Sequence, residues 1–235
     1  VRDLMPPTPE LEFLQANAGL QRVAIYQHDD QVVVGINALS LYGLAEPGGY
    51  SSLVAGRLAR LVQAGDPKEG ASGVGRWLKT NPYIIFFHRP SSRLLEILQV
   101  GYGVSPFPLA GPEMAGWEES YRGTLYIYRR SSLRPRAYVV YAAEHISDEE
   151  QAVSRLLDET LPLADVAITA EPLGLPVQPE VPGHPAGVVD YQDTRVEVVA
   201  SLSRPGLLIL ADLFYPGWQA EVDGRPTGIL RVNHI

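Results

Sequence analysis

Tyrosine and tryptophan are the residues of this sequence whose chemistry points most directly to a ligand. Each offers a flat apolar face with a polar group at its rim, which suits the faces and hydroxyls of sugars. Tyr50 follows two glycines in a turn-rich stretch and is the strongest candidate for contact with a ligand or another domain. Tyr126 and Trp218 stand on alternating strand patterns, which favour burial in a core. The other aromatic candidates are Tyr42, Trp117, Tyr121, Tyr128, Phe214 and Tyr215.

Stretches that resemble catalytic motifs fail at the positions that the chemistry requires. The glycine-rich stretch 70–76 has Arg76 where a phosphate loop needs lysine. The stretch 49–53 begins as the nucleophile turn of a hydrolase does but has Leu53 where that turn needs glycine. The five histidines do not have the spacing of local metal ligands. The sequence therefore predicts no catalytic residue, no metal site and no cofactor, while a carboxylate pair assembled from distant segments stays open.

The composition is that of a folded, acidic protein. Of 235 residues, 46% are hydrophobic and 20% charged, which argues against disorder. The net charge of −8 comes without a basic cluster, so nucleic acid is not an expected partner. Because there is no cysteine, disulfides, thiolate metal sites and cysteine nucleophiles are excluded. No apolar run is long enough to predict a membrane-spanning helix.

The elements that would position the aromatic candidates indicate an α+β fold in two portions. Residues 1–130 form a mixed α/β portion, with helical patterns at 10–16 and 51–64 and a hairpin at 22–35. Residues 131–235 are predicted to form a mainly antiparallel, jelly-roll-like β-sandwich with one helix near 148–160. That helix begins with a capping box, Ser147 with Glu150. Asp223-Gly224 predicts a tight hairpin.

The segment 207–233, LLILADLFYPGWQAEVDGRPTGILRVN, is the most distinctive stretch of the chain. Its Asp212, Tyr215-Pro216-Gly217-Trp218, Asp223-Gly224 and Asn233 resemble the C-terminal signature of the YfhO-like bacterial membrane proteins. Weaker matches precede it in order: 7–14, Arg22-Val23, Asn37 with Tyr42, Gly49-Tyr50, 94–102, 126–128 and Pro135-Arg136-Ala137.

This resemblance implies an accessory role outside the cytoplasm. Members of the family look like polytopic proteins of the glycosyltransferase-C type, which transfer sugar from a polyprenyl-phosphate carrier onto cell-envelope polymers. The part that is similar to this chain is the extracytoplasmic region after the membrane spans. The spans are absent here, as is the loop that usually holds the catalytic carboxylate. The family's closing strand pair is also missing after Ile235, so we expect the sandwich to lack its last strands.

Three hypotheses follow. The first is a non-catalytic extracytoplasmic domain on the outer face of a bacterial cell membrane, tethered through the parent chain's spans. Its implied partners are that transmembrane portion and envelope glycan or lipid-linked sugar. The second is a secreted or surface carbohydrate-binding or adhesion module of the β-sandwich type. The third, a soluble enzyme with a site shared between the two portions, has no motif in its favour.

Two sets of residues are singled out on this basis. The first set is predicted to contact a ligand or another domain: Asn37, Tyr42, Gly49 and Tyr50. The alternative for two of its members is that Asn37 caps a helical turn and Tyr42 is buried in the core. The second set is predicted to be architectural, with Trp218 filling the sandwich: Asp212, Tyr215, Pro216, Gly217, Trp218, Asp223 and Gly224. If Trp218 is buried, its change to alanine should cost about 3–5 kcal/mol of stability.

Overall fold

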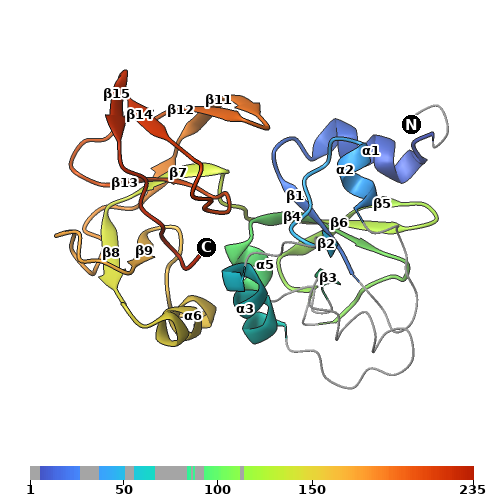
Figure 1. Cartoon of the computed structure of the whole chain (residues 1–235). Helices are drawn as coiled ribbons and strands as arrows, with labels where there is room; N and C mark the ends of the chain where they lie inside the picture. The colour runs from blue at the N-terminus through green and yellow to red at the C-terminus, as the bar shows by residue number, and fades with distance from the viewer. Residues whose placement is uncertain are drawn as a thin grey trace. The chain divides into compact units, whose positions relative to one another are not determined.

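The computed structural model describes residues 6–26, 37–50, 56–66, 84–85, 87, 93–111 and 114–235. The chain forms two compact units, Val1–Leu133 (unit 1) and Arg134–Ile235 (unit 2), where the sequence places the boundary after residue 130. Both units contain helices and strands, so the fold is α+β (Figure 1). The predicted strand at 31–35, residues 51–55 of the predicted helix and the glycine-rich stretch 70–76 lie outside the described residues.

Unit 1 is built on a four-stranded sheet. Its order is β1 (Arg22–Ile25), β4 (Val100–Ser105), β6 (Tyr126–Arg130) and β5 (Trp117–Arg122). β1 pairs with β4 in parallel, and the other pairs are antiparallel. β4 is buried along its whole length, and Gly103 within it lets the Tyr26 ring lie directly against the backbone. A side chain at this position would collide with that ring, which explains a glycine inside a strand.

Short helices and one small ribbon complete the described part of unit 1. They are α1 (Pro9–Asn17), α2 (Ala38–Leu41), α3 (Gly56–Gly65) and α5 (Arg93–Ile97), with β2 (Gly49–Tyr50) paired to β3 (Ile84–Ile85). α1 begins where Thr8 Oγ1 accepts a hydrogen bond from Leu11 N and where Pro9 needs no partner for an N–H. Its Leu14 packs with Val23 and Ile127 in a core beneath the sheet. The helix predicted at 10–16 is therefore confirmed.

Unit 2 contains several small sheets. Its three-stranded sheet has the order β10 (His184–Pro185), β7 (Ala137–Val140) and β13 (Leu207–Leu210). The remaining strands are paired as β8 (Ala142–His145) with β9 (Val166–Thr169), β11 (Gly187–Gln192) with β12 (Arg195–Val199), and β14 (Ala220–Val222) with β15 (Arg225–Thr227). No sheet closes and no clear sandwich is identified among the described residues.

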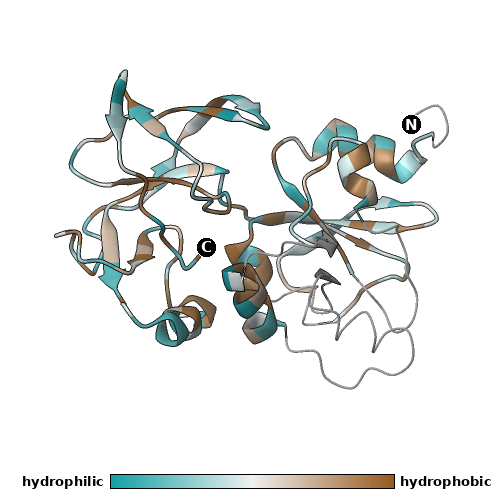
Figure 2. Cartoon of the chain, viewed as in Figure 1, coloured by the Kyte–Doolittle hydropathy of each residue, from teal (hydrophilic) through white to brown (hydrophobic). Residues whose placement is uncertain are grey.

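The helix of unit 2, α6 (Glu149–Leu157), connects the parallel strands β8 and β9. Its N-cap is Asp148, whose Oδ1 accepts a hydrogen bond from Gln151 N at 2.8 Å, so the predicted cap at Ser147 is wrong by one residue. Polar and apolar residues lie on opposite sides of α6 (Figure 2), and Ala152, Val153 and Leu156 are buried. The helix forms because its apolar positions recur at helical spacing after a strong cap.

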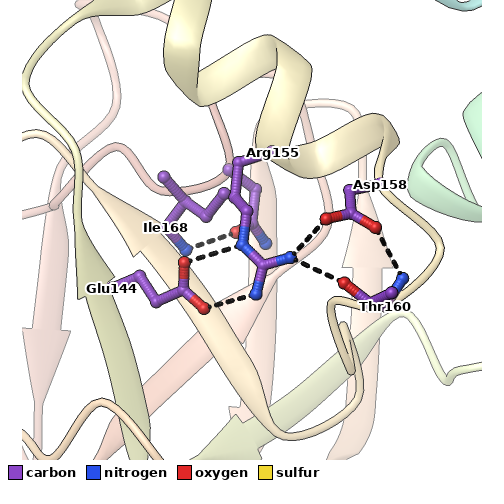
Figure 3. Close-up of polar contacts among 6 residues, drawn as sticks. Glu144, Arg155, Asp158, Thr160 and Ile168 are labelled. Atoms are coloured by element: carbon purple, nitrogen blue, oxygen red, sulfur yellow. Dashed lines mark hydrogen bonds and ion pairs between the residues drawn. The ribbon is translucent and has the colours of Figure 1, made fainter.

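One arginine ties α6 to its neighbours. The Arg155 guanidinium donates two hydrogen bonds to the Glu144 carboxylate of β8, at 2.9 and 2.7 Å (Figure 3). Its remaining nitrogen, Nη1, donates to Asp158 Oδ2 at 2.8 Å and to Thr160 Oγ1 at 3.1 Å. This geometry uses the whole guanidinium fork, which gives a bidentate pair its specificity. The strand, the helix and the turn after the helix are therefore held by a single side chain.

The C-terminal segment is held against β9 by Asn233. Its backbone N–H donates to Ile168 O at 2.8 Å, and its side-chain Oδ1 accepts from Ile168 N at 2.9 Å. Asn233 thus pairs with both backbone groups of one residue, as a neighbouring strand would. In β14–β15, Asp223 and Gly224 have φ values of 52° and 75°, which confirms the predicted tight hairpin.

The carboxylate of the buried Glu10 links α1 to a turn that is distant in sequence. Its Oε1 accepts hydrogen bonds from Thr124 N at 2.8 Å and Leu125 N at 3.4 Å, in the turn that joins β5 to β6. Burial raises the pKa of Glu10, but hydrogen bonds from its own N–H, from Thr8 and from this turn outweigh burial and hold the pKa below its ordinary value. The ionised carboxylate therefore stabilises the fold above the unfolded-state pKa, and this contribution is lost as the pH falls through the folded-state pKa.

We expect Glu10→Gln to lower the free energy of unfolding by about 1–2 kcal/mol at neutral pH, because the charge-assisted bonds to the turn weaken. The difference from the parent chain should shrink as the pH falls below the ordinary carboxyl value of 4.5. Urea unfolding of the variant and the parent chain at a series of pH values measures this difference in the free energy of unfolding. Glu12→Gln, on the exposed side of α1, is the matched control. An identical pH profile for the two variants would contradict this role for Glu10.

Candidate functional site

The two predicted sets of residues lie in different units. Asn37, Tyr42, Gly49 and Tyr50 belong to unit 1, and the residues from Asp212 to Gly224 belong to unit 2. Each set is therefore described within its own unit.

In unit 1 the predicted loop residues have different surroundings. Asn37 is exposed, adopts the left-handed conformation at φ 60° and precedes α2, and its carbonyl accepts a hydrogen bond from Ser40 Oγ. Tyr42 is buried in the core with Leu14 and Leu39. The Tyr42 ring is part of that core, which is the alternative to contact with a ligand or another domain. Gly49 and Tyr50 form β2, opposite Ile85 and Ile84 in the β2–β3 pair.

Glu46, which lies between Tyr42 and Gly49, was not singled out by the sequence. Burial raises the pKa of its carboxyl to about 7, although a hydrogen bond with the Ser40 backbone acts in the opposite direction. The carboxyl can therefore gain or lose a proton near neutral pH. A general acid or base also needs a reacting group held beside it, so Glu46 alone does not define a catalytic site. A lone glutamate in a loop carries no sequence pattern that would have revealed its pKa.

In unit 2 the structure joins Asp212 to two residues from distant parts of the chain. Arg136 Nη2 lies 2.6 Å from Asp212 Oδ1, with side-chain exposures of 8% and 17%. The same Nη2 donates to the Tyr191 hydroxyl at 2.8 Å, and that hydroxyl donates to Asp212 Oδ2 at 2.9 Å. The Arg136 guanidinium also lies over the Tyr191 ring, 5.3 Å from its centroid. We call these three residues the Arg136 cluster.

Strand register explains why the Arg136 cluster forms. In the antiparallel pair of β7 and β13, Ala137 stands opposite Leu210, and Ala211 N donates to Arg136 O at 2.9 Å. The residue before β7 and the residues after β13 therefore meet at one end of the sheet (Figure 1). Tyr191 reaches the same end from β11.

The YPGW stretch begins three positions after Asp212 in sequence. Trp218 N donates to Tyr215 O at 3.1 Å, which closes a turn around Pro216-Gly217. Tyr215 is 68% exposed and Trp218 is 36% exposed. Because Tyr215 stands three positions after Asp212 in sequence, their Cα atoms lie within about 11 Å of each other.

The prediction that Trp218 fills a sandwich core is wrong. The predicted strand starts at Trp218, whereas β14 starts at Ala220. Trp218 therefore belongs to the turn, and its side chain is 36% exposed. The predicted turn at Pro216-Gly217 is confirmed, and Asp212 has a structural partner in Arg136.

This arrangement suits a ligand rich in hydroxyl groups. Three partly exposed aromatic side chains, Tyr191, Tyr215 and Trp218, can pack against apolar faces of a sugar. The Arg136 guanidinium and the Asp212 carboxylate, which contact Tyr191, supply hydrogen-bond donors and acceptors. Within the described part of the chain, no group of three His, Asp or Glu side chains is placed to hold a metal ion.

Sequence reasoning missed Tyr191 and the role of Arg136. Tyr191 stands at the end of a strand pattern without any motif around it. Arg136 and Asp212 are far apart in sequence, and only the β7–β13 register brings them together.

Removing the carboxylate tests the ion pair. We expect Asp212→Ala to lower the free energy of unfolding by about 2–4 kcal/mol, because Arg136 is then left buried without its counter-charge. The matched control is Glu197→Ala, which removes the carboxylate from the exposed Arg195–Glu197 pair of the same unit and should cost about 0.5 kcal/mol or less. Chemical denaturation of both variants measures the difference. Equal, small losses would show that the Arg136–Asp212 pair contributes no more than a surface pair.

Comparisons of the chain with protein-family models, with curated proteins and with solved structures find no match. The candidate site therefore rests on two observations: a largely buried guanidinium–carboxylate pair bridged by a tyrosine hydroxyl, and a partly exposed Tyr–Trp turn that follows Asp212 in sequence.

Proposed function

We propose that this chain is the extracytoplasmic accessory region of a multi-spanning, YfhO-like membrane glycosyltransferase that modifies cell-envelope polymers with polyprenyl-phosphate-linked sugar. In this proposal the region is not catalytic and contacts envelope glycan or lipid-linked sugar through unit 2. The observation that carries the glycan contact is the exposure of Tyr215 and Trp218 in the turn that follows Asp212 in sequence. Large aromatic side chains are normally buried, so two in one exposed turn mark a surface suited to binding.

The residues of the YfhO-like signature support the proposal because they have identifiable tasks in the fold. Asp212 pairs with Arg136, Asp223-Gly224 closes a hairpin, and Asn233 holds the C-terminal segment on β9. Tyr215 is 68% exposed and Trp218 is 36% exposed, so both present aromatic surface to solvent. Contact with a ligand would account for large aromatic residues at these two positions.

We also propose that unit 2 is related to a jelly-roll-like sandwich. Tyr138, Val140 and Ile209 pack on one face of the β7–β13 sheet, while Leu208, whose side chain faces the other way, is 44% exposed. Further exposed apolar residues lie on the ribbons: Val189, Val199 and Val222. Apolar side chains on both faces of a sheet are typical of strands that lie between two layers.

A second candidate function is a secreted or surface carbohydrate-binding module. The same exposed Tyr–Trp turn favours it, since such a module needs an aromatic contact surface without a membrane partner. The two functions differ in the size and location of the native protein.

Fractionation of native cells separates these two functions. None of the helices in the described residues has the length and apolar composition needed to cross a membrane, so tethering in this proposal comes from other segments of the parent chain. An antibody against this region should detect a band well above 25.7 kDa in the membrane pool. A band near 25.7 kDa in the soluble or secreted pool would overturn the membrane proposal in favour of the binding module.

A binding experiment tests the glycan contact directly. We expect methyl glycosides of glucose, galactose and N-acetylglucosamine to give saturation-transfer NMR signals with the full chain. Trp218→Ala and Tyr215→Ala should weaken binding about tenfold or more, because stacking against an aromatic ring is lost. Tyr215→Ala should lower the free energy of unfolding by less than about 1 kcal/mol, because the Tyr215 side chain is 68% exposed.

Val177→Ala, which shortens another strongly exposed apolar side chain of unit 2, is the matched control and should bind as the parent chain does. Loss of binding in this control as well, or no dependence on Tyr215 and Trp218, would contradict a binding role for the turn.

A further inference from the structure

We propose that the Arg136–Asp212 pair binds neighbouring hydroxyls of an uncharged sugar, and that the Tyr191 hydroxyl occupies the position of one of them in the free protein. This inference rests on the proposed glycan contact and names the residues and the ligand class. It assigns the Arg136 cluster a role in ligand selection beyond the packing contributed by Tyr215 and Trp218.

The hydrogen bonds of Tyr191 are those that a sugar hydroxyl would make. Its hydroxyl accepts from Arg136 Nη2 at 2.8 Å and donates to Asp212 Oδ2 at 2.9 Å. A sugar hydroxyl is likewise one donor and one acceptor, so it can replace the phenol without leaving either charge unsatisfied. Tyr191 is also 37% exposed, so its ring can turn toward solvent when a ligand enters.

Arg136 has further donors for a second ligand oxygen. Its contacts with Tyr191 and Asp212 both use Nη2. Nε and Nη1 are buried, and neither has a hydrogen-bond acceptor within the described residues. Buried donors without acceptors are costly, so an oxygen that reached them on displacement of the Tyr191 ring would be favoured. The guanidinium can thus contact a second oxygen beside the displaced phenol.

Charge favours an uncharged ligand at this position. Arg136 and Asp212 neutralise each other. Unit 2 as a whole has seven arginines, no lysine and fifteen Asp or Glu residues, so its net charge is 7 − 15 = −8. The surrounding field therefore opposes an anionic sugar and has little effect on a neutral one. We infer that a neutral hexoside binds more tightly than the corresponding uronate.

The test is a titration of the full chain with methyl β-glucoside and, separately, with methyl β-glucuronide. The Arg136 Nε–Hε NMR signal reports on the buried donors, and calorimetry gives the affinity. The parent chain should show a saturable shift with the glucoside and bind the glucuronide several-fold more weakly. Tyr191→Phe should raise glucoside affinity about fivefold, because the ligand no longer displaces an internal hydroxyl. Tyr121→Phe, which removes a tyrosine hydroxyl from unit 1, is the matched control and should have no effect.

A folded Tyr191→Phe protein with unchanged or weaker glucoside affinity would overturn the inference, as would an absence of binding in both proteins. Equal or tighter binding of the glucuronide would overturn the charge argument. If glucoside binding depends on Tyr215 and Trp218 but not on Tyr191, the glycan contact stands and the role of the Arg136 cluster is refuted. The two proposals therefore fail separately.

Discussion

The pairing of β7 with β13 holds together the parts of unit 2 on which the candidate site depends. All four residues of β7 are buried, and β13 lies against them in antiparallel register. This register places Arg136 beside Asp212 at the end of the sheet, and the Tyr215–Trp218 turn follows directly in sequence. Because a slip of one residue would turn every side chain to the opposite face, the core and the ion pair specify the same register.

The residues of unit 1 that drew attention in the structure and the sequence have internal, stabilising roles. Glu10 binds the turn between β5 and β6, and Tyr42 packs in the core, so both stabilise the unit internally. Unit 2 contains a largely buried charge pair together with the partly exposed aromatic side chains of Tyr191, Tyr215 and Trp218. This combination of a charge pair and exposed aromatic side chains is why the proposed glycan contact is assigned to unit 2.

Local signals in the sequence predicted local structure. The apolar spacing of α1 and α6 and the Asp223-Gly224 hairpin are confirmed because each depends on interactions within a few residues. The Arg136 cluster could not be predicted, since it depends on the register of strands far apart in sequence. The position of Trp218 was predicted wrongly for a related reason. The alternating pattern in the sequence already starts at Trp218, whereas β14 begins at Ala220, and only pairing with another strand fixes where a strand begins.

The most direct measurement is a map of backbone amide NMR shifts in the full chain during titration with methyl β-glucoside. Binding at the proposed surface predicts saturable shifts grouped in two segments of unit 2, around Tyr191 and from Asp212 to Trp218. Shifts confined to unit 1, for example around Asn37 and Glu46, would contradict the assignment of glycan contact to unit 2.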